Sequence, residues 1–171
     1  MGMDVYGINP VINANSVKPP KINFMEASED ERMSYFDANA KYESENPGIY
    51  FRANVWSWRP LHMLIIQFCQ DYLKETGQIL IEDPVLESMG INDGDGPQEE
   101  WQCKELAKRF DVWLEHNANG HSVDLGMRVE TGGKLTDSTD PETTFSAHSI
   151  HDEHIKEFVK FLENCGGFQV C

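Results

Sequence analysis

Apolar residues recur at intervals of three and four in several separate segments, a spacing that predicts helices with one buried face. The clearest of these segments runs from Pro60, which suits a first helical turn, to Gly77, which suits a helix end. A second helix is expected after the glycine-rich loop at 90–97, and a third from Ser149 to Gly166. The expected buried stripes are Leu61, Leu64, Ile65, Phe68, Cys69, Tyr72 and Leu73; then Cys103, Leu106, Ala107, Phe110, Trp113 and Leu114; then Ile155, Phe158, Val159 and Leu162.

The N-terminal part of the chain has a different pattern. Residues 1–27 contain two proline-bearing turns and few apolar residues in register, so we expect an extended arm. Ser28 and Glu31 then stand at the spacing of a capping box, which predicts the start of another helix. That helix should bury Met33, Phe36 and Ala40 and should stop at Asn46-Pro47-Gly48.

Strand signals are fewer and lie mainly in the second half of the chain. Val123, Leu125, Met127 and Val129 alternate with polar residues, as in a half-buried strand, and residues 131–134 could turn a hairpin. Residues 168–171 resemble a short closing strand, and Asp83-Pro84 is expected to open a short helical turn. The sequence therefore predicts an α+β fold, mainly α, in which about four helices pack with a small β-hairpin or short antiparallel sheet. Residues 28–171 would form one domain with a loop or hairpin insertion at 117–148.

Composition and charge narrow the classes of function. The chain has 171 residues, 40% of them hydrophobic, which suffices for one core. Its 14 basic and 29 acidic residues give a net charge of −15, which disfavours direct binding to nucleic acid or to anionic membranes. No apolar run approaches the roughly 20 residues of a membrane span, and the start does not resemble a secretory signal. Four scattered cysteines are expected to be free thiols, in agreement with a cytoplasmic protein.

The least ordinary passage is the acid-free stretch from 48 to 62, which carries four aromatic residues and two arginines. Such residues can stack on a planar ligand or anchor a partner protein. Aromatic residues before a helix more usually complete a core, with each arginine extended to solvent or paired to one of the 29 carboxylates. Trp101, at the start of the helix expected after the glycine-rich loop, points away from the apolar stripe of that helix. The candidate binding residues are Tyr50, Arg52, Asn54, Trp56, Trp58, Arg59, His62 and Trp101.

Two polar clusters are candidates for a metal site. Asp93 and Asp95 lie in a glycine-rich loop whose oxygens suit Ca²⁺ or Mg²⁺, although the spacing departs from the twelve-residue calcium loop. His151 and His154 stand near the start of the last helix, where zinc binding or acid-base chemistry would use them. Capping and packing are the alternative roles for both clusters. No nucleophile, phosphate-loop or dinucleotide motif is present, so no cofactor is indicated.

Three passages together resemble a family of small uncharacterised bacteriophage and bacterial proteins. They are Tyr50-Phe-Arg-Ala-Asn-Val-Trp-Ser-Trp-Arg-Pro-Leu61, Asn92-Asp-Gly-Asp-Gly96, and Phe158-Val-Lys-Phe-Leu-Glu-Asn-Cys-Gly-Gly-Phe-Gln-Val-Cys171. Ala53 and Ser57 replace an Asn and a Trp found in many relatives. Some relatives carry paired Cys-x-x-Cys elements that suggest zinc, but this chain has none between 117 and 149, so the resemblance implies no zinc here.

These observations favour a non-enzymatic accessory protein of phage or bacterial origin that binds a small molecule or a host or phage protein. The alternative is a small metal-dependent hydrolase that uses Asp93, Asp95 and nearby histidines. A third reading, mimicry of nucleic acid by rows of surface carboxylates, follows from the acidity alone. A homo-oligomer is compatible with each of them.

Overall fold

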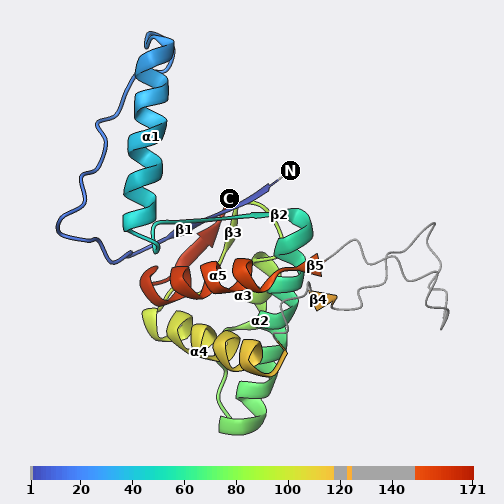
Figure 1. Ribbon diagram of the computed structural model, residues 1–171. Helices are drawn as coiled ribbons and strands as arrows, with labels where there is room; N and C mark the ends of the chain where they lie inside the picture. The colour runs from blue at the N-terminus through green and yellow to red at the C-terminus, as the bar shows by residue number, and fades with distance from the viewer. Residues whose placement is uncertain (1, 118–122, 125–148) are drawn as a thin grey trace, which may run out of the picture.

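The computed structural model describes residues 2–117, 123–124 and 149–171, which form an α+β fold (Figure 1). The described part contains five helices, one more than the sequence predicted, because the turn at Asp83 forms a helix of its own. They are α1 (Glu29–Glu45), α2 (Val55–Thr76), α3 (Asp83–Ser88), α4 (Glu100–Asn117) and α5 (Asp152–Asn164). None of them combines the length and the apolar character needed to cross a bilayer.

Four strands form an antiparallel sheet in the order β2-β1-β6-β3. They are β1 (Gly2–Gly7), β2 (Tyr50–Asn54), β3 (Gly94–Asp95) and β6 (Phe168–Val170). Alternate residues of these strands face the helices and are buried, while the others face outward. The buried set is Met3, Val5, Phe51, Ala53, Phe168 and Val170. On the outer face the Tyr50 hydroxyl donates to Asp4 Oδ1, 2.5 Å away.

The start of the chain differs from the prediction of an extended arm over residues 1–27. Residues 2–7 form β1, which lies inside the sheet between β2 and β6. Asp4 and Cys171 exchange two main-chain hydrogen bonds, of 3.0 and 2.7 Å, so distant parts of the sequence close the sheet. The closing strand expected at 168–171 is confirmed, whereas the strand at Gly94 was not predicted because it lies in a glycine-rich loop.

Helix α2 begins earlier than predicted, at Val55 rather than at Pro60. Asn54 caps it, since its side-chain oxygen accepts from the main-chain nitrogen of Ser57 at 2.8 Å. The expected end is confirmed: Gly77 adopts a left-handed conformation with φ 71°. The predicted core stripe of α2 is also buried, except that Tyr72 is partly buried and Leu73 is exposed.

Helices α4 and α5 pack against each other beneath the sheet (Figure 1). Phe158 of α5 lies at the centre of an aromatic cluster, with ring centroids 4.8 Å from Phe51, 5.5 Å from Phe110 and 5.9 Å from Trp58. The predicted stripes of both helices are therefore confirmed as core, with Trp113 only partly buried. Helix α5 starts at Asp152 with His151 as its cap, rather than at Ser149, which belongs to the short strand β5 (Ser149–Ile150).

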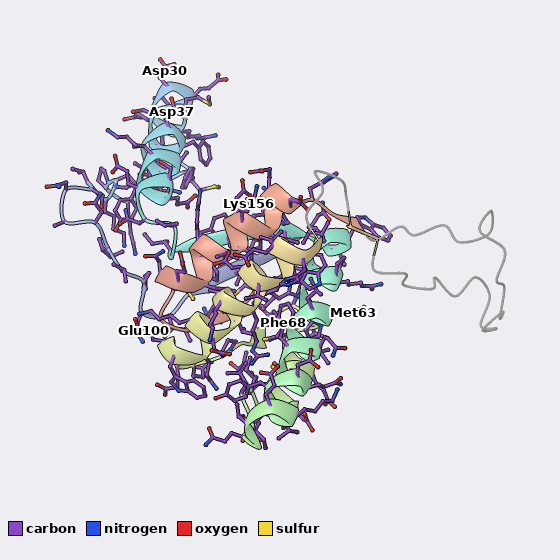
Figure 2. The ribbon with its side chains drawn as sticks, turned by 60° about the horizontal axis from the view of Figure 1, so that its bottom comes forward. Asp30, Asp37, Met63, Phe68, Glu100 and Lys156 are labelled. Carbon is purple, nitrogen blue, oxygen red and sulfur yellow. The ribbon has the colours of Figure 1, made fainter. Side chains whose placement is uncertain are left out.

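Helix α1 projects from this body, with the preceding segment running beside it (Figure 1). Its capping box is present as predicted, but Met33, Phe36 and Ala40 are exposed rather than buried. Phe36 instead contacts Phe24 of the preceding segment, and the buried residue of the helix is Tyr42, near its end. Figure 2 shows Asp30 and Asp37 on the projecting part.

The predicted hairpin at 123–134 lies almost entirely outside the described residues. Within them, β4 (Val123–Asp124) pairs antiparallel with β5.

Candidate functional site

Strand β2 passes directly into helix α2, and this junction positions the first half of the site. Asn54 is both the last residue of β2 and the cap of α2. Arg52 and Asn54 are exposed on the strand, and Trp56 follows in the first helical turn with 52% of its surface exposed. Because no loop intervenes, a cationic, an amide and an indole side chain lie within five residues of one another.

The second half of the site comes from the start of α5, about a hundred residues later in the sequence. His151, His154 and Glu157 border, together with Ile150, the same open depression as the β2–α2 junction. Its volume is about 600 Å³. We call it the β2–α5 depression; its lining is Arg52, Asn54, Trp56, Ser57, Ile150, His151, His154 and Glu157. The structure thus brings together two groups of residues that the sequence pointed to separately.

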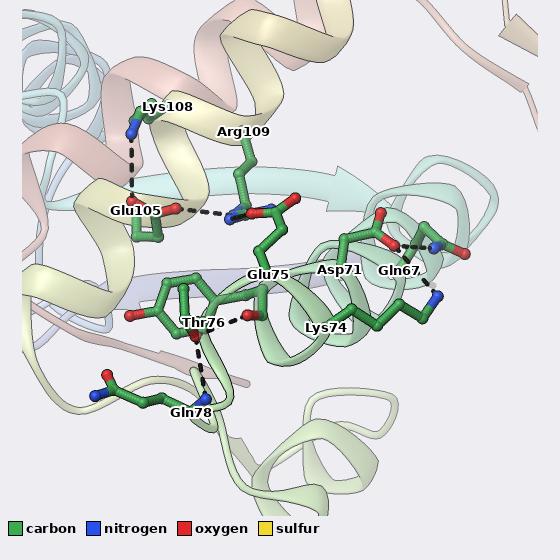
Figure 3. Close-up of polar contacts among 10 residues, drawn as sticks. Gln67, Asp71, Lys74, Glu75, Thr76, Gln78, Glu105, Lys108 and Arg109 are labelled. Carbon is green, nitrogen blue, oxygen red and sulfur yellow. Dashed lines mark hydrogen bonds and ion pairs between the residues drawn. The ribbon is translucent and has the colours of Figure 1, made fainter.

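Arg52 is a cation without an ion-pair partner among the described residues. In a chain of net charge −15, an unpaired arginine beside a depression is available to an incoming anionic group. By contrast, Arg109 is paired with carboxylates. Arg109 of α4 contacts Glu75 at 2.6 Å and Glu105 at 2.9 Å, as Figure 3 shows, and its guanidinium lies 5.2 Å from the Tyr72 ring centre.

Arg109 lines a second depression, of about 450 Å³, between α2 and α4. Its other lining residues include Phe68, Val112 and Trp113. Arg109 is already neutralised by two carboxylates, and Lys108, which also lines this groove, lies 3.9 Å from Glu105, so both of these cations are paired. The β2–α5 depression is therefore the stronger candidate.

His154 is the most constrained polar residue of the site. Its ring lies 4.9 Å from the ring of Phe51, and its Nδ1 lies 3.5 Å from Glu157 Oε2. Burial lowers the pKa of His154, although Glu157 acts in the opposite direction. The imidazole is consequently neutral at pH 7, and its buried Nε2 has no hydrogen-bond partner within the described structure.

Asp152 adds, among the described residues, a second buried polar atom without a hydrogen-bond partner to the same helical turn. It is 9% exposed, and its Oδ1 is buried without a hydrogen-bond partner in the described part of the chain. A carboxylate at the first turn of a helix is favoured by the helix dipole, which partly offsets its desolvation. The buried side-chain polar atoms that lack a hydrogen-bond partner in the described part of the chain therefore lie at the start of α5.

Several residues predicted for the binding surface lie elsewhere. Trp58 is 1% exposed, and its Nε1 donates to the Met89 oxygen at 2.8 Å, so the expectation that it lies on the surface is wrong. His62 is half-buried and its Nε2 lies 2.6 Å from the Leu86 oxygen, which joins α2 to α3. Arg59 is exposed, but it does not line the depression. The remaining two are Tyr50, which bonds Asp4 on the outer sheet face, and Trp101, which is 50% exposed on α4.

The two metal candidates do not form one centre. Asp93 and Asp95 are exposed, Asp93 with φ 59°, and the Asp95 nitrogen donates to Ser88 Oγ at 2.8 Å. These contacts fit a turn that leads into β3. Among residues 2–117, 123–124 and 149–171, no three His, Cys, Asp or Glu side chains gather closely enough to hold a metal ion. The hydrolase remains a prediction without an assembled ligand set in this part of the chain.

Sequence reasoning missed Ser57, Ile150 and Glu157. Glu157 stands three residues after His154, so helical spacing alone could have placed it on the same face. Ser57 carries no comparable signal, and Ile150 joins the site through the pairing of β5 with β4.

Comparison with protein family models, with curated proteins and with solved structures finds no match to this chain. The candidate site is therefore interpreted from its own geometry.

Proposed function

We propose that this is a non-enzymatic binding protein, an accessory protein of phage or bacterial origin acting in the cytoplasm, which holds its ligand or partner in the β2–α5 depression. The observation that carries the proposal is the convergence of Arg52, Trp56 and His154 from two distant segments on one open depression. A half-exposed indole beside an unpaired guanidinium is suited to a ligand that has both a flat face and a negative charge.

The polar groups of the depression support binding rather than a reaction. The ring of neutral His154 packs at a tilt against Phe51, and its Nε2 is buried beyond the reach of solvent, so it is poorly placed to exchange protons with a substrate. Arg52, Asn54 and Trp56 offer a charge, an amide and an indole, which recognise a ligand without activating it.

A fragment screen by NMR tests this proposal. Small planar carboxylates are titrated into the protein while the indole N–H signals of the tryptophans are followed. We expect the Trp56 signal to shift and Trp56→Ala to weaken binding about tenfold, as for a central contact residue. Trp101→Ala is the matched control, since that indole is equally exposed but does not line the depression. If Trp56→Ala and Trp101→Ala behave alike, the β2–α5 depression is not the binding site.

A further inference from the structure

Strand β2 is an edge strand whose outer main-chain groups can be identified from its pairing with β1. The Gly7 nitrogen donates to the Ile49 oxygen at 3.0 Å, and the register continues with Val5 opposite Phe51. In an antiparallel pair of strands, only every second residue forms main-chain hydrogen bonds with the partner strand. In β2 these residues are Phe51 and Ala53, which direct their N–H and C=O groups toward β1. Tyr50 and Arg52 therefore direct theirs away from β1, to the outside of the sheet.

In the described part of the chain, no strand pairs with this outer edge of β2. The strand is five residues long, keeps a continuous register and contains no proline, so its outer edge is regular. It is also not blunted by a bulge. The edge thus offers the donors and acceptors of Tyr50 and Arg52 to another extended chain.

The same edge borders the β2–α5 depression. Arg52 and Asn54 line it from the strand, while His151, His154 and Glu157 line it from α5. A strand laid against β2 would direct alternate side chains to the outer sheet face, beside Arg52, and the others toward the α5 side of the depression, where His154 and Glu157 lie. A compact small molecule would use the depression but would leave the main-chain groups of the edge unpaired.

We infer that the partner is an extended peptide segment of another protein, which adds a strand to β2 and carries an acidic residue beside Arg52. This inference rests on the proposed function and specifies its ligand class. The acidic residue follows from the Arg52 guanidinium, which has no ion pair among the described residues, because an opposite charge directly across two strands is stabilising. Main-chain pairing supplies the affinity, and the depression selects among side chains.

The test begins with selection of short peptides from a random displayed library on the intact protein. Selected peptides are then synthesised with N-methyl groups on alternate residues, in the two possible phases. Only one phase removes the N–H groups that face β2, so we expect one isomer to bind about tenfold more weakly than the other. Amide hydrogen exchange at Tyr50 and Arg52 should slow when the parent peptide binds.

Charge reversal provides the second measurement. Arg52→Glu should weaken the selected acidic peptides about tenfold, and replacing their acidic residue by lysine should restore binding. Arg59→Glu makes the same change in net charge at an exposed position outside the depression and should have little effect.

Equal binding of the two N-methylated isomers, or unchanged exchange at Tyr50 and Arg52, overturns strand addition. Failure to select any peptide that distinguishes Arg52→Glu from Arg59→Glu also overturns it. The fragment screen at Trp56 reports separately on the depression, so a positive screen without peptide binding leaves the proposed function standing and assigns the site to a small ligand. Failure of both experiments removes both proposals.

Discussion

The ring of His154 lies 4.9 Å from the ring of Phe51, so the first turn of α5 is anchored on the edge strand of the sheet through an imidazole. Phe51 in turn contacts Phe158, one helical turn further along α5. One lining residue of the depression, His154, is therefore packed against the aromatic cluster that forms the core.

The stability of the protein should depend on pH through His154. Burial lowers its pKa in the folded state, so below about pH 6.5 the unfolded chain binds a proton that the folded chain does not. The free energy of unfolding should decrease as the pH falls from about 7 to 5, and burial of His62 should add to this decrease. Urea unfolding across this range measures it.

His154→Phe should flatten that pH dependence. It keeps a ring against Phe51 and removes the buried, unpartnered Nε2, so we also expect a gain of about 1 kcal/mol at pH 7. A variant with the same pH slope as the original protein would show that His154 does not titrate as proposed.

Trp58 should contribute to stability and not to binding. Trp58→Phe loses the hydrogen bond to the Met89 oxygen and leaves a small cavity, at a cost of about 1–2 kcal/mol. Trp56→Phe, at a half-exposed position, should change the free energy of unfolding by less than about 0.5 kcal/mol. Denaturant unfolding of the two variants compares them, and similar losses would contradict the assignment of Trp58 to the core.

Gly48 should tolerate no side chain. A Cβ atom there would lie 2.1 Å from the Asn164 oxygen, where the end of α5 meets the turn before β2. We expect Gly48→Ala to cost more than about 2 kcal/mol, since main chain rather than a side-chain end must move. Gly77→Ala meets no atom within 4 Å and should cost about 1 kcal/mol through its left-handed backbone alone. The order of the two thermal midpoints checks this prediction.

Arg109 should stabilise the contact between α2 and α4. Arg109→Gln leaves Glu75 without its partner, leaves Glu105 only Lys108 at 3.9 Å, and loses the contact with the Tyr72 ring, so we expect a loss of about 1 kcal/mol. Lys41→Gln breaks an exposed pair with Glu45 at 3.9 Å and should cost less than about 0.5 kcal/mol. Equal effects in urea unfolding would show that the Arg109 cluster is no stronger than a surface pair.

The parts of the fold that the sequence predicted are those set by local periodicity. The stripes of α2 and α4 repeat over about three turns and that of α5 over about two, so each helix identifies its buried face without reference to the others. The capping box at Ser28 is likewise a matter of neighbouring residues. The prediction that the apolar stripe of α1 is buried was wrong, because Phe36 packs on Phe24 rather than on the body.

The sheet and the site required information that is not local. In β1 only Met3 and Val5 alternate as buried residues, which is too short a pattern to distinguish a strand from an extended arm. Asn54 serves as strand end and helix cap at once, so the start of α2 at Val55 was hidden behind the more obvious signal of Pro60. Arg52 and His154 line one depression because β2 lies over the start of α5, and no spacing along the chain encodes that approach.

The position of β6 constrains how the protein is made. This strand lies between β1 and β3, yet it follows every other described element in the chain. During synthesis on the ribosome, β1 and β2 can pair early, but their sheet stays incomplete until Val170 has emerged. Until then the apolar side of β1 and β2 lacks its C-terminal neighbour and the covering helix α5, a state in which a nascent chain is open to premature association.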